Sequence, residues 1–282
     1  MMKEAPIPKE AELDVVSIVE KSIAFLSKRK QSESAKAFEA QSKLLKVGGH
    51  SVNVYDSAWT NKYDAKTKTI VFIHGAGGQL SMWAEQARRF EKDYRVIAYD
   101  LMGHGKTDTT KFYSDMRLYA KDLEDLLNVL GVDPNNTILV GYSLGANVAY
   151  KFAQTHKVDR TAFIGMHLSK NYVKMSYRTL SLIIGDAVTR EWPEYRHKTT
   201  TIGFTSAVFS YMNEKEVLPQ VGDIPTLIIN GKKDKMTPMK EAERLSKQIP
   251  NSEFIIFPTA SHDVQTQPEF DGVLRKFIEG KR

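Results

Sequence analysis

The stretch Ile138-Leu139-Val140-Gly141-Tyr142-Ser143-Leu144-Gly145-Ala146-Asn147 decides the fold that this sequence predicts. Its first three residues form an aliphatic run that is typical of a strand covered on both faces. Apolar residues then follow at helical spacing, so a strand, a turn and a helix succeed one another within a few positions. Ser143 lies at the turn, and the glycines on either side of it complete the pattern G-x-S-x-G.

The turn gives Ser143 the properties of a nucleophile. A sharp strand-to-helix turn holds the serine in a strained backbone conformation. The residues two before and two after it crowd each other, so both must be small, and both are glycine. We expect the hydroxyl to be exposed at the carboxyl end of the sheet. The N–H groups and the positive dipole end of the following helix should point at the same spot.

Strands and helices alternate through most of the chain. A hairpin over residues 44–59 comes first, and the later alternation predicts an α/β fold: a mostly parallel sheet with right-handed crossovers, flanked by helices. The predicted strands are 69–73, 94–99, 138–140, 161–166, 226–230 and 253–257, and the predicted helices are 10–28, 83–90, 118–130, 239–249 and 270–278, besides the one after Ser143.

The alternation divides the chain into three parts. Residues 1–42 are predicted to be an N-terminal helical extension, which either packs on the outside of the domain or serves as an arm for a membrane or a partner. Residues 43–167 and 223–282 form the predicted core. Between them, residues 168–222 break the alternation and are rich in aromatic residues and methionine. An insertion of this size is too long for a plain loop, so we predict a small helical cap over the carboxyl edge of the sheet.

Composition excludes several classes of function. The chain of 282 residues has no cysteine, which removes disulfides, thiolate metal sites and a cysteine nucleophile. No run approaches the roughly 18 apolar residues of a membrane span, and the start shows no signal peptide. We therefore expect an intracellular, cytoplasmic protein. The net charge of +6 (40 minus 34) is scattered, which argues against nucleic acid and leaves weak association with anionic membranes open.

Five segments in a fixed order carry a resemblance to a known family. Over roughly residues 43–280 the chain resembles the α/β-hydrolase fold superfamily, whose serine hydrolases place their site at the strand ends. The segments are His74-Gly75-Ala76-Gly77-Gly78, residues 100–108 with Gly103-His104-Gly105, Gly141-Tyr142-Ser143-Leu144-Gly145, Ile229-Asn230-Gly231-Lys232-Lys233-Asp234 and Ala260-Ser261-His262.

The resemblance implies a catalytic triad in the order nucleophile, acid, histidine. Ser143 is the nucleophile, and it needs an adjacent base because a serine hydroxyl is too weak an acid to ionise alone. His262, in a short loop after a predicted strand, is the expected base. His74 and His104 lie in loops that the family uses structurally, and His167 is the strongest rival. The remaining histidines, which have the features of surface or hairpin residues, are His50, His156 and His197.

The acid is expected at a strand end between the serine and the histidine. Asp234 follows the predicted strand 226–230 and is the candidate, although an ordinary turn aspartate would have the same setting. The preceding strand ends without a carboxylate. Asp223 comes before its strand and so belongs to the opposite edge, and Asp263 would have to fold back on its neighbour His262.

The family's oxyanion hole consists of two backbone N–H groups. By resemblance, Leu144 supplies one and Ala76 the other, with Gly77 as the alternative to Ala76. The same glycine-rich loop does not match either nucleotide-binding pattern, G-x-x-x-x-G-K-[ST] or G-x-G-x-x-G.

These residues imply a serine hydrolase of carboxylic esters that requires no metal and no cofactor. The apolar content of the predicted cap favours an apolar acyl or lipid-like ester. The same triad also serves thioesterases, amidases, C–C bond hydrolases and perhydrolases. A serine in place of aspartate at the turn argues against the family's epoxide hydrolases and haloalkane dehalogenases. A small-molecule receptor on the same scaffold is the alternative from another class.

Overall fold

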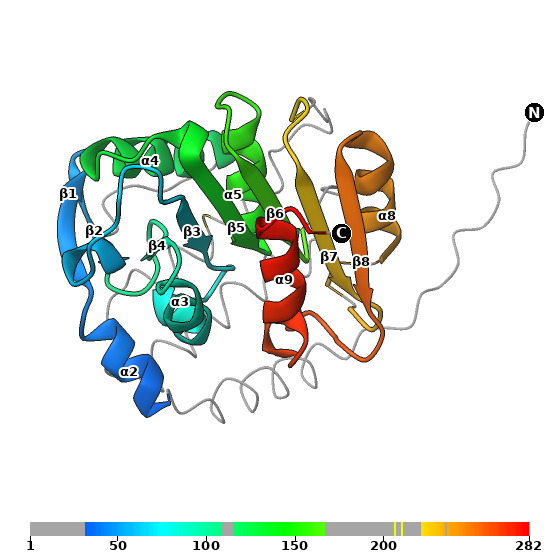
Figure 1. Cartoon of the computed structure of the whole chain (residues 1–282), viewed down its shortest axis with the longest axis horizontal. Helices are drawn as coiled ribbons and strands as arrows, with labels where there is room; N and C mark the ends of the chain where they lie inside the picture. The colour runs from blue at the N-terminus through cyan, green and yellow to red at the C-terminus, as the bar shows by residue number, and fades with distance from the viewer. Residues whose placement is uncertain are drawn as a thin grey trace, which may run out of the picture.

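The described part of the chain forms an eight-stranded sheet with helices on both faces (Figure 1). The computed structural model describes residues 32–108, 115–166, 206, 210, 221–234, 236–237 and 239–281. The predicted helix 10–28 lies outside these residues, as does the predicted cap except for residues 206, 210, 221 and 222. Within the described ranges, no helix has the length and apolar character needed to cross a membrane.

The sheet has the order β1-β2-β4-β3-β5-β6-β7-β8. The first two strands form an antiparallel hairpin and β2 pairs antiparallel with β4, whereas every neighbouring pair from β4 to β8 is parallel. The predicted mostly parallel sheet is therefore confirmed. The strands are β1 (Lys43–Val47), β2 (His50–Asp56), β3 (Thr69–Ile73), β4 (Arg95–Tyr99), β5 (Thr137–Tyr142), β6 (Arg160–Ile164), β7 (Thr226–Gly231) and β8 (Ser252–Phe257).

The helices cover the sheet as two layers because the central strands are apolar on both faces. α4, α5 and α8 bury their apolar residues on one face, and α2, α3 and α9 bury theirs on the other. The elements are α2 (Glu33–Glu39), η1 (Ser57–Trp59), η2 (Leu80–Trp83), α3 (Ala84–Phe90), α4 (Met116–Val129), η3 (Pro134–Asn136), α5 (Leu144–Ala153), α8 (Met239–Gln248), η6 (Val264–Thr266) and α9 (Phe270–Ile278).

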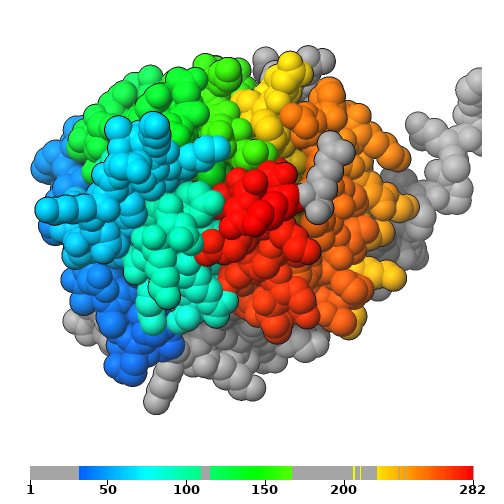
Figure 2. Space-filling view, in the orientation of Figure 1, coloured from blue at the N-terminus to red at the C-terminus, as the bar shows by residue number. Residues whose placement is uncertain are grey.

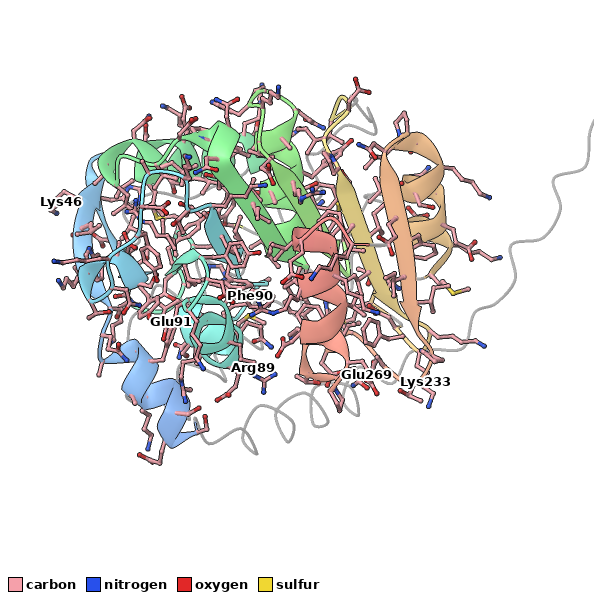
Figure 3. All side chains as sticks on the ribbon, in the orientation of Figure 1. Lys46, Arg89, Phe90, Glu91, Lys233 and Glu269 are labelled. Carbon is pink, nitrogen blue, oxygen red and sulfur yellow. The ribbon has the colours of Figure 1, made fainter. Side chains whose placement is uncertain are left out.

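Two helices far apart in sequence, α3 and α9, are tied together on the second face. In Figure 3 the labelled Arg89 and Phe90 lie at the end of α3, next to α9. The guanidinium of Arg275 lies 4.8 Å from the centroid of the Phe90 ring, and Arg89 forms an ion pair with Asp271. α9, near the C-terminus, therefore packs beside α3 in the helix layer on this face of the sheet.

Two sequence expectations need correction. Leu118 fits the apolar period of the predicted helix 118–130, so we expect it on the face that packs against the sheet, but it is 42% exposed because α4 presents its other apolar residues there. The strand predicted to reach residue 166 ends at Ile164, where Gly165 adopts a positive φ of 56°. His50 lies in the hairpin as expected, and it is buried there, with Nε2 3.7 Å from Asp122 Oδ2.

Candidate active site

The turn between β5 and α5 holds Ser143 in a left-handed conformation. Its φ is 51°, and it is the one non-glycine residue with positive φ in the described ranges. Such a conformation costs roughly 1–2 kcal/mol and persists only where the surroundings impose it. The Ser143 N–H donates to the carbonyl of Ile164 at 2.8 Å, which fixes the turn against the end of β6.

The two glycines around the serine are required by close backbone contact. A Cβ atom on Gly145 would lie 2.2 Å from the carbonyl oxygen of Ile73, and one on Gly141 would lie 2.3 Å from that of Gly145. Neither neighbour is a flexible side chain that could move away. The expectation that both positions must be small is therefore confirmed, and α5 begins directly against the end of β3.

Ser143 is less accessible than the pattern predicts. We expected an exposed hydroxyl, but the residue keeps only 7% of its surface exposed. The loop after β3 contributes to this burial, because a Cβ on Gly75 would lie 3.2 Å from the Ser143 Cβ. We call residues 74–80 the β3 loop. The β3 loop and the serine turn therefore form one contact region at the carboxyl edge of the sheet.

His262 and Asp234 form a direct hydrogen bond. His262 Nδ1 lies 2.7 Å from Asp234 Oδ2, and the two side chains are 14% and 0% exposed. Burial acts to raise the pKa of Asp234, but the hydrogen bond and charge of His262 and the donors of Thr237 outweigh it and hold that pKa below its usual value. The carboxylate is thus an acceptor, so Nδ1 carries the proton and Nε2 is left to accept another.

The imidazole lies beside the serine turn. The ring centroids of His262 and Tyr142, the residue before Ser143, are 5.0 Å apart. A Cβ on Gly165, just after β6, would lie 3.1 Å from His262 Cε1. The structure therefore places Ser143, Asp234 and His262 at the ends of β5, β7 and β8, on one edge of the sheet.

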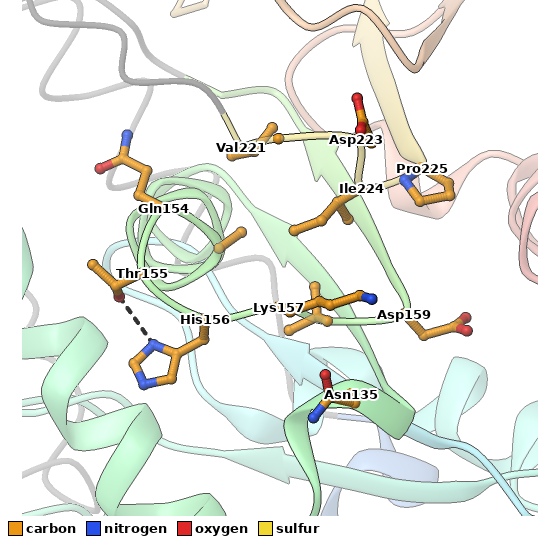
Figure 4. A pocket seen from close by; sticks show the side chains of 13 residues that line it. Asn135, Gln154, Thr155, His156, Lys157, Asp159, Val221, Asp223, Ile224 and Pro225 are labelled. Atoms are coloured by element: carbon orange, nitrogen blue, oxygen red, sulfur yellow. Dashed lines mark hydrogen bonds between the residues drawn. The ribbon is translucent and has the colours of Figure 1, made fainter.

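The rival acids lie elsewhere. Asp263 is at the N-cap of η6. Asp223 precedes β7 and lines a cavity of about 830 Å³ beside the C-terminal end of α5 (Figure 4). Other lining residues, among them Asn135 and Asp159, precede β5 and β6. The cavity therefore lies at the amino edge of the sheet, opposite Ser143. Of the rival histidines, His167 and His197 fall outside the described residues.

The predicted oxyanion donors are available. Neither the Ala76 nor the Leu144 N–H donates to another of the described residues. Leu144 is the first residue of α5, where an N–H has no partner within the helix. Ala76 is half-buried in the β3 loop, and Gly77 beside it is exposed, with a φ of 72°. We keep both N–H groups as the proposed donors to a substrate oxygen.

Thr237 is a site residue that the sequence did not reveal. Its hydroxyl donates to Asp234 Oδ2, the oxygen that His262 also contacts, and its N–H donates to Asp234 Oδ1 at 2.9 Å. The same hydroxyl lies 3.4 Å from His262 Nδ1. A threonine three residues after an aspartate is typical of a turn, so its spacing could have indicated the backbone contact but not the link to the histidine.

No metal site accompanies these residues in the part of the chain that the structure describes. There, no group of three or more His, Cys, Asp or Glu side chains is arranged to hold a metal ion. The polar groups beside the serine turn are the His262 imidazole, the buried Asp234 carboxylate and backbone N–H groups.

Two buried histidines, His74 at the start of the β3 loop and His104 in the loop after β4, are neutral. His74 Nδ1–H donates to the carbonyl of Gly75 at 2.7 Å, and its Nε2 accepts the Leu101 N–H at 3.0 Å. A ring that both donates and accepts must be neutral. His104 donates to the carbonyl of Met102, and its ring centroid lies 5.2 Å from that of His74. Burial lowers the pKa of His74 to about 3 and that of His104 to about 4.

These two rings should make the protein less stable in acid. Their pKa is about 6.5 in the unfolded chain, so below that pH the unfolded state binds more protons than the folded state. Their contribution is complete above pH 6.5 and is lost as the pH falls toward 4. We expect the free energy of unfolding to fall by about 2 kcal/mol per ring between pH 7 and pH 5. Urea unfolding at a series of pH values measures this loss.

A substitution separates this effect from that of other groups. His104→Asn keeps a donor for Met102 but cannot titrate, so about half of the loss that the two rings cause should disappear. An unchanged pH dependence in that variant would show that His104 is not held neutral by the fold.

Two family models match this chain. The model of the α/β-hydrolase fold matches residues 68–172, and a model described as TAP-like protein matches residues 207–278. The first match contains Ser143 and the β3 loop, and the second contains Asp234 and His262.

Curated relatives align with this chain over very different shares of their own length. An uncharacterized protein of Mycobacterium tuberculosis is 33% identical over 41% of this chain, and the chain spans only about a third (34%) of that relative. A putative non-heme chloroperoxidase of Synechocystis is 26% identical over 69% of this chain and 84% of the relative. The pimeloyl-[acyl-carrier protein] methyl ester esterase of Vibrio atlanticus is 24% identical over 68% of this chain and 86% of the relative.

Solved structures share the fold at low identity. An α/β hydrolase enzyme from a Medee basin deep-sea metagenome library superposes with a TM-score of 0.72 at 17% identity, covering 85% of this chain and 98% of the other. The enol-lactonase of Burkholderia xenovorans LB400 gives 0.69 at 18% identity, covering 84% and 100%. These likenesses concern the architecture of the sheet and its helices.

Proposed function

Because this chain belongs to the α/β-hydrolase superfamily, we propose that it is a serine hydrolase that cleaves carboxylic esters. The observation that carries the proposal is the hydrogen bond of 2.7 Å between His262 and a buried, ionised Asp234, beside the strained turn of Ser143. A histidine oriented in this way presents Nε2 as a base. A serine at positive φ, between two glycines, presents its hydroxyl to a substrate.

The mechanism follows from these positions. The Ser143 oxygen attacks the ester carbonyl while His262 Nε2 takes the hydroxyl proton, and Asp234 stabilises the imidazolium. The N–H groups of Leu144 and Ala76 bind the carbonyl oxygen, which becomes negative. When the tetrahedral intermediate collapses, the C–O bond to the alcohol breaks and the alcohol leaves with the proton from His262. Water then repeats the sequence and releases the acid and the free serine.

The ester assignment has its own support. The Vibrio relative named above is a methyl ester esterase, and it aligns over most of its length. Thioesterase, amidase, C–C bond hydrolase and receptor functions use the same scaffold and are the alternatives. The test is purified wild-type protein with p-nitrophenyl butyrate, a matched thioester and a matched anilide. Turnover of the ester at least tenfold above the other two supports the proposal, and no turnover of any of them points to a receptor.

We also propose that the substrate has an apolar acyl group. The support is the aromatic and methionine content of residues 168–222, which lie between β6 and β7 and so follow a strand that ends at the edge where Ser143 stands. Each buried methylene adds about 0.8 kcal/mol, which is about fourfold in kcat/KM. We expect kcat/KM to rise by one to two orders of magnitude over the first few added carbons, measured with p-nitrophenyl esters from acetate upward.

A fall in kcat/KM along this series of p-nitrophenyl esters would contradict the proposed apolar acyl group. If kcat/KM falls steadily from the acetate onward, the acyl pocket is small and polar, and the lipid-like substrate class is wrong. The ester proposal itself would survive that result, because the acetate would still be cleaved.

A further inference from the structure

The short helix α2 lies outside both family matches, yet it is firmly attached to the core. Phe38 is 2% exposed, and its ring centroid lies 4.2 Å from that of Tyr55 on β2. The Ser34 hydroxyl donates to Glu85 on α3 at 2.8 Å. Figure 2 shows the blue surface of α2 directly against the turquoise surface of α3. The family models begin at residue 68, so neither of them includes this helix.

Glu39, the last residue of α2, joins two loops at the active edge. Its side chain is 16% exposed. Oε2 accepts a hydrogen bond from Gln79 Nε2 in the β3 loop at 3.2 Å. Oε1 lies 2.9 Å from Lys106 Nζ, in the loop after β4. A single carboxylate therefore bridges the two loops, and a half-buried charged pair of this kind is stronger than an exposed one.

The β3 loop needs such support near its glycines. At its start His74 Nε2 accepts the Leu101 N–H, and at its end the Leu80 N–H donates to Asp100 Oδ1 at 2.6 Å. Between these anchors stand three glycines and Ala76, residues without polar side chains. One bond inside this segment, from the Gly78 N–H to the Gly75 carbonyl at 3.0 Å, closes a turn around Ala76. Glycine has wide conformational freedom, so the position of this turn, and with it the Ala76 N–H, depends on what fixes the ends of the segment. Gln79, the residue just after the glycines, is the one that Glu39 contacts.

We propose that Glu39 is a positioning residue: through Gln79 it holds the β3 loop so that the Ala76 N–H stays directed at the substrate oxygen. This inference rests on the proposed serine hydrolase function. Glu39 touches no reacting atom and acts on the rate through the loop. Removing one oxyanion donor costs 10²- to 10³-fold in kcat, and a donor that is displaced part of the time should cost about tenfold.

Hydrogen exchange tests the bracing without any substrate. In full-length Glu39→Ala, peptides that contain residues 75–80 should exchange several-fold faster than in wild type. The control is Glu33→Ala on the same helix, whose side chain is 90% exposed and pairs only with Lys36 among the described residues. It should leave the exchange unchanged. If Glu39→Ala is unstable, Glu39→Gln, which keeps one acceptor oxygen, should give a smaller change in the same direction.

Kinetics tests the effect on the reaction. Glu39→Ala should lower kcat for p-nitrophenyl butyrate about tenfold with KM within twofold of wild type, because the oxyanion contact strengthens only in the transition state. Gln79→Ala should have a similar effect, and the double variant should be no worse than either single one, since the two residues form one contact. Glu33→Ala should retain wild-type kcat.

The outcomes separate this inference from the proposed function. If wild type cleaves no ester, the proposed function fails, and unchanged exchange in Glu39→Ala would overturn the bracing as well. If wild type cleaves the ester and Glu39→Ala keeps its kcat, the positioning role is wrong while the hydrolase assignment stands. Additive losses in the double variant would also overturn it, because Glu39 would then act by another route than Gln79.

Discussion

Ser143→Ala should lower kcat/KM for a p-nitrophenyl ester by about 10⁴-fold or more. The hydroxyl is the only covalent nucleophile in the mechanism, and enzymes that lose a triad residue keep only the small rate that binding and the oxyanion donors provide. The measurement is steady-state turnover of p-nitrophenyl butyrate. KM has no meaning once turnover is lost, so substrate affinity is followed separately by competition.

The fold of this variant should be unchanged. Alanine at φ 51° carries about the same backbone strain as serine, and the N–H that bonds to Ile164 remains. The free energy of unfolding should stay within about 0.5 kcal/mol of wild type. Ser246→Ala, which removes a hydroxyl bonded to Glu243 on α8, is a control that should keep full activity. A folded Ser143→Ala protein with wild-type kcat would contradict the assignment of the nucleophile.

Asp234→Asn should lower kcat by about 10⁴-fold, which is nearly as large as the effect expected for Ser143→Ala. Asp234 Oδ2 accepts from His262 Nδ1, whereas an amide in its place can donate to that nitrogen and favour the tautomer with the proton on Nε2. In that tautomer the imidazole can no longer accept the serine proton. The loss should appear in kcat and in kcat/KM alike, because the effect acts on the transition state. Steady-state kinetics on purified variants measures both.

The rival carboxylates supply matched controls. Asp223→Asn alters a residue at the opposite edge of the sheet, and Asp263→Asn alters the cap of η6, so both should stay within a few-fold of wild type. Thr237→Val removes the hydroxyl that donates to Asp234 and should fall between these controls and Asp234→Asn. If Asp223→Asn were the variant that loses activity, the assignment of the acid to the end of β7 would be wrong.

The parts of the fold that could be predicted are those set by short-range patterns. The apolar run before Gly141 is buried on both faces in β5, and the glycine spacing predicts the close backbone contact between Gly141 and Gly145. Asp234 could be chosen over Asp223 because parallel strands place their carboxyl ends on one edge. Each of these inferences needs only a few neighbouring residues and the handedness of the fold.

What could not be predicted depends on contacts between distant residues. Leu118 fits the helical period, but the rotation of α4 on the sheet decides that it is exposed. The contacts of Glu39 with Gln79 and Lys106 join residues 40 and 67 positions apart, and no local pattern encodes them. The burial of Ser143 likewise depends on how closely the β3 loop packs on the turn, which follows from tertiary structure alone.

Covalent labelling reports in a single experiment on Ser143 and the groups that activate it. A fluorophosphonate reacts with a serine only where a base activates the hydroxyl and donors stabilise the oxyanion, so it reports on the whole arrangement at once. Intact-mass spectrometry of wild-type protein should show one added phosphonyl group, digestion should place it on Ser143, and Ser143→Ala should remain unlabelled. Wild-type protein that stays unmodified under conditions in which a known serine esterase reacts completely, or a label on another residue, would rule out Ser143 as an activated nucleophile.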